Sequence, residues 1–464
     1  MRVLIVGLDC ADPSLVFERW REDLPNLSRL MDAGSYGELI SSIPAMTVPA
    51  WACMMSGKDP GQLGFYDFRN RADYSYEYLT MATSSAVKVD RVWDMASRAG
   101  KQAIVVSVPQ TYPVRAVNGA MVSCFLTPST RSQYTYPPEL KPEIEGLFSG
   151  EFLVDVPQFR TEDKDFLLSQ IYEMSDQHHA VVKHLLASRP WDLAMHVDIG
   201  VDRMHHGFWK YFDARHPKHE PGNPYQTAVR DYYVHLDRQL GEWLELSLAG
   251  DDTAVLVVSD HGGQPMMGGV CLNEWLKQQG YLVLEYQPEG IVPLEKCEVD
   301  WSRTTAWASG GYCSRLYLNV KGREPEGLVD PADYERIRDE IAAGIAAIPL
   351  PMPGGAGTCP PSPSFKPDQI YAEVNNIAPD LIVYPGNLSW RAVGSLGWNS
   401  LYASEQDGGP DDANHRQEGL YIYYNPKKPG QRRTSQRHLL DVVPTVLELM
   451  GLEAPADLRG KSFA

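Results

Sequence analysis

The sequence lacks three features that would place it in a definite class. Its seven cysteines are odd in number, scattered and never paired as CxxC, so neither a disulfide framework nor a thiolate zinc site is expected. No apolar stretch approaches the roughly 20 residues that cross a bilayer. The opening run MRVLIVGLD is short, with no small-residue cleavage site, and therefore indicates a buried strand rather than a signal peptide. These absences predict a cytoplasmic protein that does not contact a membrane.

Positive charge is also scarce. The chain has 42 Lys and Arg against 60 Asp and Glu, a formal net charge of -18. Such a field repels nucleic acid polymers and anionic membranes, so neither is expected as a partner. A small anionic substrate would need local positive charge, which bound metal ions could supply. The composition does not indicate which oligomeric state the protein adopts.

What the sequence does contain is an alternation of strand and helix patterns over 464 residues. Runs of β-branched residues predict buried strands at Val3–Val6, Ala103–Val108, Leu193–Val197, Ala254–Val258 and Leu381–Tyr384. Helical patterns cover Lys164–Leu186, Tyr225–Leu248, Tyr334–Ala347 and His438–Met450. This alternation predicts an α/β fold whose mostly parallel central sheet has helices on both faces.

Some segments interrupt this rhythm. The first segment lies at about 66–89. The second, at 349–365, is rich in Pro and Gly and cannot form a regular helix or strand. We expect a single catalytic domain over 1–464, with cap or insertion segments at about 66–89, 130–165 and 285–370. The part from 285 to 305 is too irregular to assign.

Two aspartates follow predicted strands directly. Asp9 ends the first strand, and Asp260 ends another, with His261 next to it. The carboxyl ends of parallel strands form the ligand crevice of an open sheet, so these side chains should share one edge. A lone aspartate after a strand is more often a cap. The adjacent Asp260 and His261 are more informative, because carboxylate and imidazole together suit Zn²⁺ or Mn²⁺.

A third strand leads into the segment DRMHHGFW. If this segment is helical, Asp202 and His206 lie on one face, close enough to share an ion, and His205 points about 100° away. Asp198 is a competing ligand that ranks second. A helix cap with an ordinary surface histidine explains the segment equally well.

Thr47 is the candidate nucleophile. It precedes Pro49, and proline favours the start of a helix, where free N–H groups and the dipole would bind a phosphoryl group. A coordinated divalent ion can lower the pKa of a threonine hydroxyl. The common alternative is that Thr47 is merely an N-cap. His415 lies in a polar segment, where a histidine is usually exposed to solvent.

Together these segments resemble the alkaline phosphatase superfamily, in particular its branch of type I phosphodiesterases and nucleotide pyrophosphatases with related phosphohydrolases and phosphomutases. The resemblance extends through most of the chain and rests on the order and joint presence of its motifs. They are VGLD, TVPAWACMMSG followed by GFYDF, DRMHHGFW, VVSDHGG, YLNVKGREPEG, APDLIVY, NHRQEGLYI and DVVPTVLELMGLEAP.

The resemblance implies a binuclear metal site and a covalent mechanism. Two divalent ions are implied, usually Zn²⁺, with Mn²⁺ or Fe as alternatives. Thr47 would attack phosphorus, and water would then cleave the phosphothreonine. The implied ligands are Asp9, Thr47, Asp260 and His261 for one ion, and Asp202, His206 and His415 for the other.

The resemblance implies a phosphodiesterase acting on a small phosphate ester. Many nucleotide pyrophosphatases place a phosphate-binding asparagine shortly after the nucleophile, where this chain has Phe68. Arg69 or Asn70 could make that contact instead. Trp307, with Tyr312 and Phe68, could stack on an organic leaving group.

Two other functions remain as alternatives. One is a phosphomonoesterase or phosphomutase of the same superfamily. The other, from a different class, is a non-catalytic binding module that kept the fold. A sulfatase would need a cysteine or serine at the position of Thr47.

Overall fold

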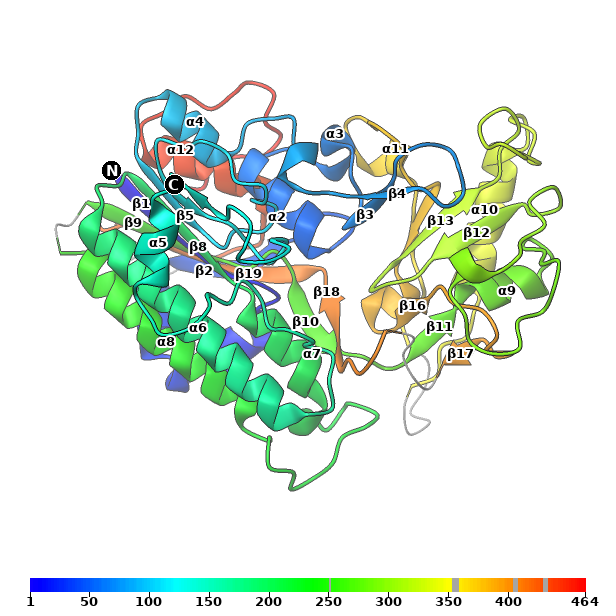
Figure 1. Cartoon of the computed structure of the whole chain (residues 1–464), viewed down its shortest axis with the longest axis horizontal. Coiled ribbons are helices and arrows are strands. Elements are labelled where there is room, and N and C mark those ends of the chain that lie inside the picture. The colour runs from blue at the N-terminus through cyan, green and yellow to red at the C-terminus, as the bar shows by residue number, and fades with distance from the viewer. Residues whose placement is uncertain (250–251, 353–358, 404–407, 429–432) are drawn as a thin grey trace.

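A ten-stranded, mostly parallel sheet forms the centre of the molecule (Figure 1). The computed structural model describes residues 1–249, 252–352, 359–403, 408–428 and 433–464. The strand order is β20-β2-β19-β9-β1-β8-β5-β6-β7, with β21 also paired to β2. Among the described strands of this sheet, only β19 and β7 run antiparallel to their neighbours. The strands are β1 (Arg2–Leu8), β2 (Ser35–Ile40), β5 (Ala103–Val106), β6 (Gly119–Val122), β7 (Thr135–Tyr136), β8 (Leu193–Asp198), β9 (Thr253–Val258), β19 (Glu418–Tyr424), β20 (Arg433–Thr434) and β21 (Arg437–His438).

Helices cover both faces of this sheet, because alternate side chains of each strand point to opposite sides. On β1, Leu4 and Val6 pack into one cluster of buried residues, and Val3 and Ile5 into another. Figure 1 shows α4 and α12 on one side of the sheet and α6 and α8 on the other. The predicted α/β class is confirmed. One face carries α1 (Pro25–Ala33), α6 (Lys164–Ser188), α7 (Gly200–Phe212) and α8 (Ala228–Ser247), and the other α2 (Thr47–Ser56), α4 (Val92–Arg98) and α12 (Val442–Leu449).

The register of the central strands aligns their carboxyl ends. Leu8 of β1 pairs with Asp198 of β8, and Gly7 pairs with Val258 of β9. The segments that follow these three strands therefore emerge at one edge of the sheet.

A second lobe, residues 269–403 as far as they are described, lies beyond that edge (Figure 1). Its antiparallel sheet has the order β12-β13-β15-β14. The predicted strand at Leu381–Tyr384 is real, but it lies in this antiparallel sheet and not in the parallel one, since an apolar run is equally buried in either. The lobe contains β11 (Gly269–Cys271), α9 (Leu272–Gln278), β12 (Ala306–Ser309), β13 (Ser314–Leu318), α10 (Tyr334–Ala346), β14 (Ser364–Phe365), β15 (Leu381–Val383), β16 (Arg391–Val393) and β17 (Tyr402–Ala403).

The expected insertions take different forms. Segment 66–89 contains a hairpin that reaches the second lobe, where Tyr76 stacks on Trp301 with ring centroids 3.7 Å apart. Part of the stretch 349–365 lies outside the described residues. The division into one domain with insertions stays a prediction. The remaining elements are η1 (Leu15–Arg19), η2 (Arg21–Asp23), α3 (Pro60–Leu63), β3 (Arg69–Arg71), β4 (Leu79–Met81), η3 (Ser84–Ala86), α5 (Leu140–Glu145), β10 (Gly262–Pro265), η4 (Leu294–Lys296), α11 (Pro367–Ile370), η6 (Pro385–Leu388), β18 (Ala413–Arg416) and η7 (Leu439–Asp441).

Within the part of the chain that the structure describes, none of the helices combines the length and the apolar character needed to cross a membrane.

A buried carboxylate joins α8 to the start of α1. Asp237 accepts hydrogen bonds from the backbone N–H groups of Asn26 and Leu27, at 3.1 and 2.8 Å, and from the Asn26 amide at 3.0 Å. The anion therefore satisfies helix N–H groups that have no partner within the helix.

We predict that Asp237→Ala destabilises the fold by about 2–3 kcal/mol, because it leaves buried donors without acceptors. The measurement is the shift of the thermal or urea unfolding midpoint. Glu245→Ala, on the exposed side of the same helix, is the matched control and should shift the midpoint little. Equal midpoints for the two variants would contradict the capping role.

Candidate metal centre

The ends of two neighbouring strands, β1 and β9, bring two aspartates and a histidine together. Asp9 follows β1, and Asp260 and His261 follow β9. All three are fully buried. The Nε2 atom of His261 lies 3.2 Å from Oδ2 of Asp260 and 3.8 Å from Oδ1 of Asp9. The two strands thus deliver their polar ends to one point, as the parallel arrangement predicted.

The segment after β8 is helical, and its geometry distinguishes between Asp202 and Asp198 as candidate ligands. On α7, the carboxylate of Asp202 lies 3.1 Å from Nε2 of His206, one turn later. His205 points elsewhere, with its Nε2 3.2 Å from the hydroxyl of Tyr233. Asp198 instead accepts a hydrogen bond from Tyr232 at 2.9 Å. The geometry therefore favours Asp202 over Asp198 as a member of the cluster.

His415 is buried and not solvent-exposed, contrary to the usual expectation for its polar surroundings. It lies on β18, which pairs with β10 between the central sheet and the second lobe (Figure 1). Its ring stacks on that of His261 with centroids 3.8 Å apart, and its Nε2 lies 3.9 Å from Oδ1 of Asp202. Pairing with β10 thus brings a residue from far along the chain into the cluster.

Thr47 is the first residue of α2. The N-cap is Met46, which makes no side-chain capping bond, so Thr47 is not the N-cap residue. The Thr47 hydroxyl lies 3.4 Å from Nε2 of His261. This position joins a helix N-terminus to the carboxylate and imidazole cluster.

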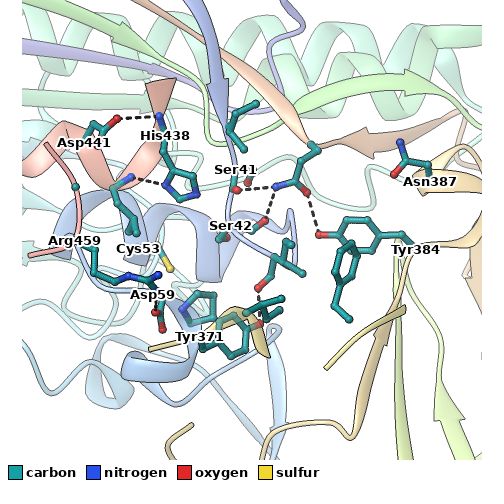
Figure 2. A pocket seen from close by; sticks show the side chains of 18 residues that line it. Ser41, Ser42, Cys53, Asp59, Tyr371, Tyr384, Asn387, His438, Asp441 and Arg459 are labelled. Carbon is teal, nitrogen blue, oxygen red and sulfur yellow. Dashed lines mark hydrogen bonds and ion pairs between the residues drawn. The ribbon is translucent and has the colours of Figure 1, made fainter. Parts of the chain in front are cut away.

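Hydrogen bonds hold the loop before Thr47, and Figure 2 shows those that reach the carbonyls of Ser41 and Ser42. The side-chain amide of Gln417 donates to the carbonyls of Ser41 and Ser42 at 2.6 and 3.1 Å. The backbone N–H of Ala45 donates to the hydroxyl of Tyr384 at 2.9 Å. A separate pocket of about 510 Å³ is lined by Ser41, Ser42, Tyr384 and Gln417 among others, and by none of the cluster residues. The segment that leads into Thr47 is therefore held in place by these hydrogen bonds.

Unsatisfied polar atoms mark the centre of the cluster. Asp202, His206 and His415 can each offer an atom within 4.8 Å of the others, and so can Asp9, Asp202 and His261. Buried polar atoms rarely lack partners, and carboxylate oxygens with imidazole nitrogens are ligands that suit Zn²⁺ or Mn²⁺. The residues present fit a bound metal cation. Among the described residues, no hydrogen-bond partner exists for Oδ1 of Asp9, Oδ1 of Asp202, Oδ2 of Asp260, Nε2 of His206 or Nε2 of His415.

The other atoms of the same side chains are hydrogen-bonded. Trp51 donates its indole N–H to Oδ2 of Asp9 at 2.7 Å. On the histidines, Nδ1 of His206 lies 2.6 Å from Asp411, and Nδ1 of His415 lies 2.8 Å from the carbonyl of Ala45. Protonation at Nδ1 leaves the lone pair of Nε2 facing the cluster. The sequence did not predict a role for Asp411, because nothing in DDANHRQEG distinguishes it from neighbouring acids.

Burial shifts the acid–base properties of these groups. Burial, with the charges of Asp260 and Asp202, raises the pKa of Asp9 well above its usual range. Burial opposes ionisation of Asp202 too, but the adjoining His206 holds the pKa of that carboxyl well below its usual range. Burial lowers the pKa of His261 to about 4. A cation binds neutral imidazole and ionised carboxylate. Burial opposes protonation of His206, but the charges of Asp411 and Asp202 raise its pKa to about 9, so a cation bound there would displace a proton.

A cleft of about 430 Å³ opens over Thr47, Asp202 and His415. Of the expected substrate contacts, Phe68 and Arg69 line it, as does Tyr312. Asn70 does not line it; its amide forms hydrogen bonds with the backbone of Tyr66 and Asp67, both at 2.7 Å. Trp307 is buried in the second lobe, stacked on Tyr317. The structure thus brings together seven metal-site candidates but only part of the expected substrate contacts.

Known proteins resemble this chain in sequence and in fold. The profile of the family described as type I phosphodiesterase / nucleotide pyrophosphatase matches residues 3–411. Human ectonucleotide pyrophosphatase / phosphodiesterase 5 superposes with a TM-score of 0.56 at 12% identity, over 100% of this chain and 98% of that chain. That likeness shows a shared fold. The comparison with curated protein sequences returned no match. Because the family profile covers most of its length, the chain belongs to the type I phosphodiesterase / nucleotide pyrophosphatase family, and it is a hydrolase that acts on phosphate ester bonds.

Proposed function

We propose that the chain is a metal-dependent phosphodiesterase that cleaves a small phosphate ester through a covalent phosphothreonine at Thr47. The observation that carries this proposal is the set of buried, unsatisfied carboxylate and imidazole atoms beside the Thr47 hydroxyl. A site with no cation would leave those charges uncompensated, which is costly.

The proposed ligands fall into two groups that share one rim. Asp9, Thr47, Asp260 and His261 would hold one divalent ion, and Asp202, His206 and His415 the other. Zn²⁺ is the first choice, and Mn²⁺ or Fe would suit the same donors. Bound ions would lower the pKa of the Thr47 hydroxyl and neutralise charge on the phosphoryl oxygens.

The chain's own groups supply position and charge. The first N–H groups of α2, which lack partners within the helix, would face the phosphoryl oxygens. Oγ1 of Thr47 forms a bond to phosphorus as the bond to the leaving alcohol breaks, and the hydroxyl proton is lost to solvent. The leaving oxygen takes a proton from water. A second water then adds to phosphorus, the bond to Thr47 breaks, and the threonine regains its proton.

We predict that Thr47→Ala lowers kcat on bis(p-nitrophenyl) phosphate by at least ~10³-fold, since no nucleophile remains. Thr47→Ser should retain measurable turnover, because it keeps the hydroxyl. Steady-state assays of metal-loaded protein make the measurement, with p-nitrophenyl phosphate and p-nitrophenyl sulfate as comparison substrates. A wild-type rate in Thr47→Ala would refute the covalent mechanism. Faster turnover of the monoester would favour the phosphomonoesterase alternative.

Metal content tests the ligand assignment. His206→Ala should lose one ion of the pair, because it removes a proposed ligand from α7. Elemental analysis of the purified protein makes the measurement. His205→Gln is the matched control on the same helix, where the side chain faces Tyr233, and it should keep both ions. Identical metal content in the two variants would overturn the assignment.

Asp411 offers a more subtle test. Asp411→Asn should weaken metal affinity about 10- to 100-fold, because an uncharged partner at Nδ1 makes His206 a poorer donor. Competition with a chelator of known affinity measures this change. Asp412→Asn is the neighbouring control, since Asp412 lies 3.6 Å from Lys210 instead. Unchanged affinity in Asp411→Asn would show that this carboxylate serves packing alone.

A further inference from the structure

A buried arginine lies in the wall of the cleft above the metal centre. Arg203 follows Asp202 on α7 and lines the cleft together with Thr47. Only 9% of its side chain is exposed. A buried guanidinium costs free energy unless acids and hydrogen-bond acceptors match it. The partners of Arg203 therefore indicate whether it serves the fold alone.

Two carboxylates match part of this guanidinium. Asp155 accepts hydrogen bonds from Nε and Nη2 of Arg203, at 2.9 and 2.7 Å, and such a paired contact fixes the plane of the group. Nη1 donates to Oδ2 of Asp202 at 2.7 Å. A phenyl ring covers one face, since Cζ of Arg203 lies 4.2 Å from the ring centroid of Phe159. The arginine is thus held in one orientation by three neighbours.

Part of the donor capacity of Arg203 remains unused. A guanidinium carries five N–H groups, and the three hydrogen bonds to Asp155 and Asp202 use one each on Nε, Nη1 and Nη2. No residue in the described ranges accepts a hydrogen bond from the second N–H of Nη1 or of Nη2. Buried polar groups usually have partners, so these two donors are available to an acceptor that enters the cleft.

The unused donors lie next to the metal centre. Asp202 joins the two, because its Oδ2 accepts from Nη1 of Arg203 while its Oδ1 lies 3.1 Å from Nε2 of His206. Thr47, the proposed nucleophile, lines the same cleft. A phosphate ester that reaches Thr47 therefore brings its oxygens into a cleft whose wall presents a fixed cation with N–H groups to donate.

We propose that Arg203 is a further catalytic residue, whose two remaining N–H groups bind the non-bridging oxygens of the reacting phosphoryl group, and that Asp155 positions it. This inference deepens the proposed phosphodiesterase function and rests on it. The N–H groups of a guanidinium lie in one plane and match phosphate in geometry and in charge. Donors that are already held in place stabilise the charge of the transition state without reorganising.

Arg203→Lys tests the proposal, because lysine keeps a positive charge beside Asp202 but lacks the planar set of donors. With bis(p-nitrophenyl) phosphate and saturating metal, we expect kcat/KM to fall about 10- to 100-fold. The Ki of inorganic phosphate as a competitive inhibitor should rise at least ~10-fold, since the phosphate loses the same donors. An arginine that only supported Asp202 would leave this Ki unchanged. Elemental analysis checks that the variant retains its metal.

Asp155→Asn tests the positioning role. It keeps Arg203 but weakens the contact that fixes the guanidinium, so kcat/KM should fall about 3- to 10-fold, less than in Arg203→Lys. The double variant should be little worse than Arg203→Lys alone, because both changes act through one group. Arg336→Lys, in which 56% of the original side chain is exposed on α10, is the matched control and should change neither kcat/KM nor Ki.

The outcomes separate the inference from the function on which it rests. If the metal-loaded wild type does not cleave the diester, the proposed phosphodiesterase function fails. If it does, but either kcat/KM or the Ki of phosphate in Arg203→Lys stays within about threefold of the wild type, the inference is wrong and the function stands. The inference is also wrong if phosphate does not inhibit the wild type, or if Arg203→Lys no longer binds metal at saturating concentrations.

Discussion

Three buried carboxylates, Asp9, Asp202 and Asp260, meet where the strands of the central sheet end, and their mutual repulsion constrains everything around them. Taking ions out of water costs several kcal/mol each, and like charges raise that cost. Only positive charge at the same point offsets it. Arg203 neutralises the far oxygen of Asp202, but the inward oxygens of all three carboxylates have no hydrogen-bond partner among the described residues. The fold therefore holds an excess of negative charge at this point that cations would balance.

Rigid elements hold the three carboxylates in these positions. The parallel register of β1, β8 and β9 aligns the strand ends, and the buried contacts of α2 and α7 fix the helices that begin there. Backbone carbonyls and Asp411 orient the histidine rings. Hydrogen bonds with Gln417 and Tyr384 hold the loop before Thr47 in place. Strand register, helix packing and hydrogen bonds thus together position the candidate ligands.

The sequence predicted the parts of this arrangement that depend on local pattern. From apolar strands ending in Asp9 and Asp260, and from the helical spacing of Asp202 and His206, the sequence predicted side chains that the structure brings together at one edge of the sheet. Local pattern alone could not place residues that are positioned by pairing across the chain. His415 is buried because β18 pairs with β10, and Leu381–Val383 joins the second sheet through β13; periodicity carries no information on such partners. Trp307 was expected at the cleft, but composition cannot tell an aromatic in a core from one in a pocket.

The central sheet and the second lobe contribute different kinds of residue to the site. Candidate ligands come from the central sheet, its helices and the β10–β18 pair, whereas Tyr312, Arg315 and Arg391 reach the cleft from the second lobe. Substitution of cleft residues in the second lobe that do not contact the cluster, unlike Tyr312, can therefore change which molecule enters while the candidate ligands keep their positions. A scaffold divided in this way can acquire new specificities over evolutionary time while its chemistry stays constant.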